Sequence, residues 1–144
     1  MTFFLFPSDR QTSALLASAE DGPVHMLNML RFNEFAAYPT DHPNAGKGLT
    51  GADAYALYGE GSAPIFKRVG GSIIHSWVPE VLVIGPEDEQ WDRIFVACYP
   101  SKSSIIAMFR DPSYQKLVPH RTAALKTSRL IRMKPMEIHQ RFSE

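Results

Sequence analysis

Two polar residues stand at positions where a side chain could act on a small molecule. Tyr99 lies at a Tyr-Pro-Ser corner between a strand and a helix, so its hydroxyl could donate a hydrogen bond to a ligand oxygen. Capping by Ser101 and packing of the tyrosine ring explain the same corner without a ligand. Arg31 is a fixed cation near the end of an apolar strand. It could pair with a substrate carboxylate or form a plain salt bridge to Asp92 or Glu34.

His120 is the candidate for proton transfer. A histidine on a helix is usually a surface or capping group, but the neighbouring Arg121 carries a fixed charge that would depress the imidazole pKa. A neutral imidazole near physiological pH can act as a general acid or base. The candidate catalytic set is therefore His120, Tyr99 and Arg31, with Arg121 as a ligand contact.

Further residues are candidates for binding a ligand. Asn28 interrupts an apolar strand, and a buried amide without partners costs on the order of 1–3 kcal/mol. It must therefore bond backbone at a strand irregularity or hold a ligand. Residue parity places Asn28 and Arg31 on opposite faces unless a bulge intervenes. Tyr55 and Tyr58, three apart on one helix, belong either to the core or to a pocket wall. The aromatic rings of Trp77 and Phe95 are also candidates. The predicted ligand-binding set is therefore Asn28, Tyr55, Tyr58, Trp77, Phe95 and Arg121.

Composition gives little support for metal, haem, nucleic acid or membranes. The histidines are scattered over separate elements, and the single cysteine, Cys98, lies in an apolar run typical of a buried filler. A haem enzyme would need an axial histidine such as His75 or His120, and nothing else points there. We expect neither a metal nor an organic cofactor. Fifteen basic and fifteen acidic residues cancel, which argues against nucleic-acid binding. No run approaches the ~20 apolar residues of a membrane span, so a cytoplasmic protein is expected.

The elements that must position these residues follow a ferredoxin-like order. With 144 residues, 44% of them apolar, residues 1–144 are expected to form a single domain. Along the chain the core elements follow the order strand, helix, strand (or a pair of strands), strand, helix, strand. A leading helix at about 8–20 and a long loop at 33–50 are additions to this order. This is the split βαβ pattern, an α+β antiparallel sheet with helices on one face. The expected strands are 24–32, 72–78, 80–84, 91–99 and 129–133. The later helices are expected at about 51–70, 102–110 and 111–127, with Gly59, Gly61 and Pro64 bending or breaking the first of these.

Alternation along the strands suggests that both faces of the sheet are at least partly buried. No element remains to cover the face away from the helices, so a second copy of the chain is the economical cover, and a homodimer is expected. In the strand at 91–99, the expected helix-facing set is Ile94, Val96 and Cys98, and the expected partner-facing set is Arg93, Phe95, Ala97 and Tyr99. In the strand at 72–78, Ile73, His75 and Trp77 are expected to share one face.

Several local motifs occur in an order that resembles a known family. The chain is similar to the domain of unknown function 1330 family, within the dimeric α+β barrel superfamily, from about Val24 to Met133. The resemblance implies a ferredoxin-like protomer and a dimer, and it implies no activity. The motifs are Met26 to Phe32, Gly51 with Tyr55 and Tyr58, Gly70-Gly71, Trp91-Asp92, Tyr99-Pro100-Ser101, Phe109 with Asp111-Pro112 and Tyr114-Gln115, and His120-Arg121 leading to Ser128-Arg129.

Two function classes fit these features. The first is a cofactor-independent small-molecule enzyme of the oxygenase, isomerase or cyclase kind, with a pocket between sheet and helices or at the dimer. The second is a non-catalytic small-molecule-binding or structural dimer. A titratable group with a perturbed pKa inside the pocket favours catalysis, whereas a lining of only apolar side chains and a tyrosine favours binding.

Overall fold

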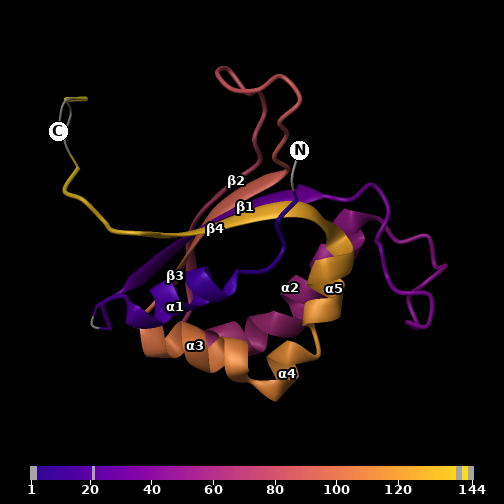
Figure 1. Cartoon of the computed structure of the whole chain (residues 1–144), viewed down its shortest axis with the longest axis horizontal. Coiled ribbons are helices and arrows are strands. Elements are labelled where there is room, and N and C mark those ends of the chain that lie inside the picture. The colour runs from indigo at the N-terminus through magenta and orange to yellow at the C-terminus, as the bar shows by residue number, and fades with distance from the viewer. Residues whose placement is uncertain (1–2, 21, 139–140, 143–144) are drawn as a thin grey trace.

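The backbone forms one antiparallel sheet with helices on one side (Figure 1). The computed structural model describes residues 3–20, 22–138 and 141–142. In this part of the chain the strands are β1 (Val24–Phe32), β2 (Ser72–Trp77), β3 (Arg93–Tyr99) and β4 (Leu125–Met133), in the spatial order β2-β3-β1-β4. The helices are α1 (Asp9–Ala17), α2 (Gly51–Arg68), α3 (Lys102–Arg110), α4 (Pro112–Gln115) and α5 (Val118–Ala124). The predicted ferredoxin-like α+β fold is confirmed.

Side-chain caps determine where four of the helices begin. Ser8 and Thr50 each form a capping box, in which the cap oxygen accepts from a backbone N–H three residues later and the side chain there returns the bond. Ser101 accepts from a backbone N–H in the first turn of α3, and Asp111 caps α4 ahead of its proline. All four starts agree with the sequence prediction, because cap chemistry is local.

Helix α2 runs without interruption, so the predicted break is absent. Its glycines and Pro64 lower helix propensity, but the helix packs on α5, and tertiary contacts outweigh that cost. One glycine has a packing reason. A Cβ on Gly61 would lie 2.5 Å from a methyl carbon of Leu117. The small residue therefore lets α2 approach the segment that precedes α5.

The predicted strand at 80–84 and the predicted helix at 111–127 also differ from the structure. Residues 80–84 form no strand, and residues 78–92 instead connect β2 to β3 as an extended excursion that rises above the sheet (Figure 1). The single helix predicted at 111–127 is divided into α4 and α5, and α5 ends at Ala124 rather than at Thr127. The chain enters β4 at Leu125, where it pairs with Phe32 of β1. Burial of Leu125 and Thr127 in the sheet outweighs the helical periodicity.

The predicted assignment of strand faces is reversed in β3. Paired residues in an antiparallel sheet point to the same side. Ala97 and Tyr99 pair with Met26 and Val24, and all four are buried in a core with residues of α2 and α3. The face with Phe95, Ala97 and Tyr99 therefore meets the helices. The other face, with Ile94, Val96 and Cys98, points away from them, and its apolar character cannot by itself distinguish a helix-covered face from an open one.

A bulge in β2 explains a second difference. Ile73 pairs with Ala97, whereas His75 pairs with Val96, so Ile74 is the extra residue. Ile73 therefore shares the helix-covered side with Ala97, and His75 and Trp77 share the opposite side with Val96. The strict alternation predicted for Ile73, His75 and Trp77 does not occur.

Loop 33–50 is joined tightly to the body of the fold. The Asn33 N–H donates to the Ala124 carbonyl at 2.8 Å, and the Gly51 N–H donates to the Asn33 carbonyl at 3.1 Å. A Cβ on Gly51 would lie 2.2 Å from the Asn33 oxygen and 2.6 Å from the Ala124 oxygen. Only glycine fits where loop, α2 and α5 meet.

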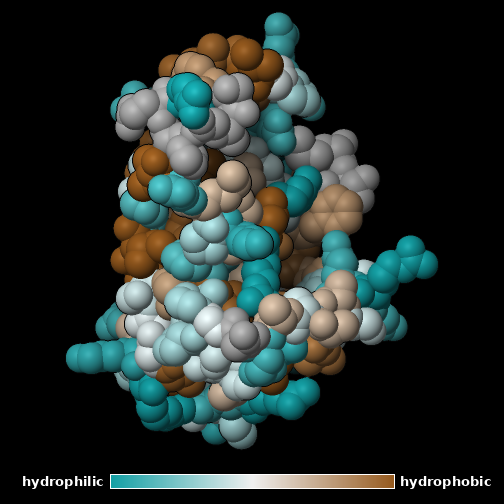
Figure 2. All heavy atoms as spheres, turned by 90° about the vertical axis from the view of Figure 1, so that its left-hand side faces the viewer, coloured by the Kyte–Doolittle hydropathy of each residue, from teal (hydrophilic) through white to brown (hydrophobic). Residues whose placement is uncertain are grey.

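The sheet face away from the helices is left uncovered in the single chain. Every residue of β2 is exposed, and Trp77, Ile131 and Met133 are each about half exposed. Figure 2 shows hydrophobic side chains gathered mainly in the upper part of that view, with mostly hydrophilic side chains below. We call the side of the sheet opposite the helices the open face. An apolar surface of this kind is typical of an interface.

Candidate functional site on the open sheet face

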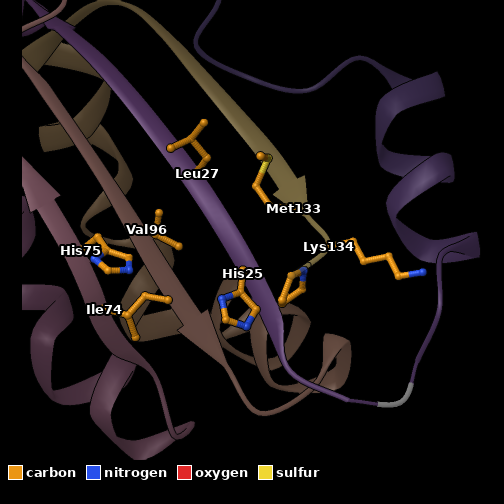
Figure 3. A pocket seen from close by; sticks show the side chains of 8 residues that line it. His25, Leu27, Ile74, His75, Val96, Met133 and Lys134 are labelled. Atoms are coloured by element: carbon orange, nitrogen blue, oxygen red, sulfur yellow. The ribbon is translucent and has the colours of Figure 1, made fainter. Parts of the chain in front are cut away.

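A hollow of about 290 Å³ lies on the open face. Its floor is apolar and comes from four neighbouring strands, while His25 and His75 supply imidazoles (Figure 3). In the single chain the hollow is open to solvent, and its lining combines apolar side chains with a few polar groups, as small-molecule sites do. The lining residues are His25, Leu27, Ile74, His75, Val96, Met133, Lys134 and Pro135.

Strand register determines this grouping. His25 on β1 stands between Cys98 of β3 and Met133 of β4, and the Cys98 Sγ lies 4.0 Å from its Nε2. One row further along, Leu27 pairs with Val96, which pairs in turn with His75 of β2. The two imidazoles thus flank the apolar floor from strands that are separated by β3.

The rings beside the hollow are ordered by stacking. The His75 imidazole stacks on the Trp77 indole with centroids 5.3 Å apart and an interplanar angle of 11°. Trp77, predicted as a ligand contact, is therefore next to the hollow through His75. Lys134 follows β4 directly, and its side chain points away from the other lining residues (Figure 3).

Tyr99, Tyr55 and Tyr58 lie on the other side of the sheet, among the helices. Tyr99 packs edge-on against Phe66, and its hydroxyl contacts the Met108 Sδ at 3.8 Å. The expectation that this hydroxyl points toward a partner subunit is wrong, because Tyr99 belongs to the helix-covered face. Tyr55 and Tyr58 do pack on each other, with ring centroids 5.3 Å apart.

Burial keeps these phenols neutral. The Tyr58 and Tyr114 hydroxyls are joined by a hydrogen bond of 2.7 Å. Desolvation raises the pKa of Tyr55 to about 12 and raises the pKa of Tyr58 and of Tyr99 further. Such groups donate hydrogen bonds but do not act as bases near neutral pH.

Asn28 and Phe95 face each other across β1 and β3 on the same helix-covered side. The Asn28 Nδ2 donates to the Met26 carbonyl at 3.1 Å. Of the two predicted alternatives for this amide, a bond to backbone or a bond to a ligand, the structure has the bond to backbone. Phe95 packs against both clusters of the core. Phe95 and Tyr99 lie on the helix-covered side and Trp77 lies on the open face, so these predicted site residues do not line one pocket.

His120 lies at a third place, under loop 33–50. Its Nδ1 is joined to the Tyr38 hydroxyl by a hydrogen bond of 2.6 Å, and the His42 ring stacks on Tyr38. The pKa of His120 is lowered, first by burial and then by the charge of His42. The direction agrees with the prediction, but the cause is not Arg121.

Arg121 lies on α5, and Arg31 lies near the end of β1. Arg121 donates to the Leu5 carbonyl at 2.8 Å and to the Ser128 hydroxyl at 3.3 Å, which fastens the N-terminal segment to β4. Arg31 lies at a register shift between β1 and β4, opposite Thr127. The Asp92 carboxylate accepts from the backbone N–H of Phe32 at 2.7 Å.

Sequence reasoning did not select His25, His75, Cys98 or Met133 for the site. The alternation of residues along β1 places His25, Leu27 and Met29 on one face. This alternation was the sequence signal that could have indicated His25 as a site residue. The reversed faces in β3 and the bulge in β2 concealed the rest.

The described residues contain neither a metal-binding cluster nor a membrane-spanning helix. No group of three or more His, Cys, Asp or Glu side chains is placed to hold a metal ion. No helix there is long and apolar enough to cross a membrane.

Solved structures give both near and distant similarities. A protein of unknown function from Rhodopseudomonas palustris, RPA0582, is 42% identical; the match covers 95% of this chain and 100% of that one, with a TM-score of 0.87. SnoaB, a cofactor-independent oxygenase from Streptomyces nogalater, is 11% identical over 83% of this chain and 99% of that one, with a TM-score of 0.52. At3g17210 from Arabidopsis thaliana is 14% identical over 81% and 98%, with a TM-score of 0.51. The last two similarities show the fold alone.

No curated protein matches this sequence. A family described as "Domain of unknown function (DUF1330)" matches residues 48–134, which is more than half of the chain. Together with the 42% identity to the Rhodopseudomonas palustris protein, this match confirms the resemblance seen in the sequence motifs. The chain belongs to the DUF1330 family.

Proposed function

We propose that this protein is a homodimer that packs through its open sheet faces and takes up a small organic molecule in the hollow beside His25 and His75. Within that role we propose metal-free acid–base chemistry, as in cofactor-independent oxygenases, isomerases or cyclases. The observation that carries the proposal is the pair of imidazoles on an apolar floor of about 290 Å³. The tyrosines between sheet and helices are buried and paired, so they do not carry it.

The dimer is supported by the surface that the single chain leaves uncovered. Trp77, Ile131 and Met133 expose apolar area on the open face. Burying apolar surface stabilises an interface by roughly 25 cal/mol per Å² before the costs of association. A partner on this face would also enclose the hollow and exclude water from it.

The chemistry follows from the side chains that line the hollow. An imidazole can serve as a general base or as a general acid, so one ring would remove a proton from a bound molecule while the other donates one. The apolar floor suits the body of a small organic molecule, and a ring nitrogen suits its hydroxyl or carbonyl oxygen. No Asp or Glu is among the described lining residues, so the site has no intrinsic repulsion for an anionic intermediate.

Binding without turnover is the alternative, and one observation favours it. His75 is stacked on Trp77 and exposed, and no carboxylate among its described contacts orients it as a base. Pocket-lining imidazoles of that kind also serve plain recognition.

The test is a screen of small phenols and carboxylic acids by side-chain ¹⁵N NMR of the histidines. We expect active compounds to shift the ring signals of His25 and His75 and to leave His42 unchanged. His25→Asn and His75→Asn should each weaken binding about tenfold, the loss expected for one hydrogen bond, whereas the matched control His42→Asn should not.

Turnover is then followed by mass spectrometry in air without added metal or cofactor. Conversion that is lost in His25→Asn supports the enzyme, and tight binding without conversion supports the alternative. Compounds that shift His42 and His120 instead of the open-face histidines would contradict both.

A further inference from the structure

The excursion between β2 and β3 exposes an unusual run of apolar side chains. We call residues 78–89 the arm. Val78, Val81 and Val83 are 67%, 77% and 84% exposed, and Ile84 is 91% exposed. The arm contains no helix or strand, and it stands above the sheet on the side away from the helices (Figure 1). Exposed apolar side chains of this kind stabilise a structure only when another surface buries them.

The charges of the arm are of one sign. Residues 78–89 contain Glu80, Glu87, Asp88 and Glu89, and they contain no lysine or arginine. Residues 125–136, which comprise β4 and the segment after it, carry the opposite sign. They contain Lys126, Arg129, Arg132 and Lys134 and no acidic residue.

Among the residues that the structure describes, neither set is neutralised by ion pairs. Among the described residues, no ion pair involves these acidic or basic side chains; the ion pairs found there are Arg68–Asp111 and Lys102–Glu20. Arg132 donates to the Ser18 hydroxyl and the Ala19 carbonyl, and Arg129 stacks on Phe4 and Trp91. The acidic arm and the basic strand therefore match each other in charge.

The basic strand also has apolar side chains that suit the arm. Ile131 and Met133 of β4 are 44% exposed on the open face. Met133, Lys134 and Pro135 form one wall of the hollow. A partner segment lying on this end of β4 would therefore close the hollow from that side.

We infer that the arm of one protomer packs on β4 and residues 134–136 of a second copy of this chain, with its valines and Ile84 on Ile131 and Met133 and its carboxylates near Lys134. This inference rests on the proposed dimer. In it, each hollow is completed by the arm of the other protomer. The two contacts in a symmetric dimer are equivalent.

Charge reversal in complementary variants tests the inference. The arm variant is Glu87→Lys/Asp88→Lys/Glu89→Lys, and the strand variant is Lys134→Glu. Each homodimer has two mismatched contacts, so we expect its dissociation constant to rise about tenfold or more at low salt. In an equimolar mixture the reversed arm meets the reversed strand and the unchanged arm meets the unchanged strand. Heterodimers should therefore dominate over both homodimers in native mass spectrometry.

A matched control is Glu60→Lys on the exposed side of α2, which should leave the dissociation constant unchanged. Arm and strand variants that dimerise as tightly as the unmodified chain, with no preference for heterodimers, would overturn the arm contact and leave the dimer standing. An unmodified chain that is monomeric at all concentrations would instead overturn the proposed dimer. The two failures are thus distinguishable.

Discussion

The hydrogen bond between Tyr58 and Tyr114 gives a test of whether the space between sheet and helices is packed core. The hydroxyls are 2.7 Å apart, and Tyr114 is only 6% exposed. Tyr58→Phe removes one hydroxyl and leaves the other buried without its partner. The free energy of unfolding should fall by about 1–3 kcal/mol. Tyr114→Phe should have a similar effect for the same reason.

The double variant Tyr58→Phe/Tyr114→Phe separates the bond from the loss of each group. Removing both hydroxyls leaves no orphaned group, so the cost of the double variant should be about that of one single variant, with a coupling energy of about 1–3 kcal/mol. Urea unfolding measures the free energy of unfolding of the unmodified chain, the two single variants and the double variant. All four are compared at one protein concentration, because dimerisation makes stability depend on concentration. Additive effects, or single costs below about 0.5 kcal/mol, would refute the reasoning, since they would mean that water or a ligand reaches these hydroxyls.

Two further predictions concern loop 33–50 and its neighbours. Gly51→Ala should lower the free energy of unfolding by about 2 kcal/mol or more, because the new methyl group meets backbone oxygens. The control Gly59→Ala has open space and should be neutral or stabilising by up to about 1 kcal/mol in the same urea titration. For His120, the lowered pKa means that the unfolded chain binds a proton more readily. Stability should therefore be fully present above pH 6.5 and fall as the pH drops below it.

His120→Gln should flatten that acid slope relative to the unmodified chain. Unfolding curves between pH 5 and 8 measure both slopes. A slope in the His120 variant that equals the slope of the unmodified chain would contradict the assignment. It would place the acid sensitivity in another group.

Local chemistry explains why much of the fold could be predicted. Ser8, Thr50, Ser101 and Asp111 cap helices through bonds within a few residues, so the sequence alone locates the starts. The bounds of β1 follow from a dense apolar run that ends at Phe32. The order of the elements then leaves the ferredoxin-like sheet as the simplest arrangement.

The faces of the strands could not be predicted in the same way. Along β3, both alternating sets are largely apolar, so periodicity gives no sign of which set meets the helices. Pairing with Val24 and Met26 decides it, and that information is long-range. The bulge at Ile74 also leaves no clear signal in the sequence, yet it moves His75 and Trp77 to the open face.

The candidate site was predicted only in part for the same reason. Tyr55 and Tyr58 are adjacent as expected from their spacing on one helix. The partners of His120 come from Tyr38 and His42 in a loop without periodicity, and no spacing rule connects residues so far apart. The hollow draws His25 and His75 from strands that meet only through β3.

The most direct test of the account is a crystal structure of the protein purified without added ligand. We predict two protomers that face each other through their open sheet faces, with an enclosed hollow beside His25 and His75 and density in it for a small molecule. An open face left in solvent, or a hollow filled by the partner's side chains, would contradict the proposed site.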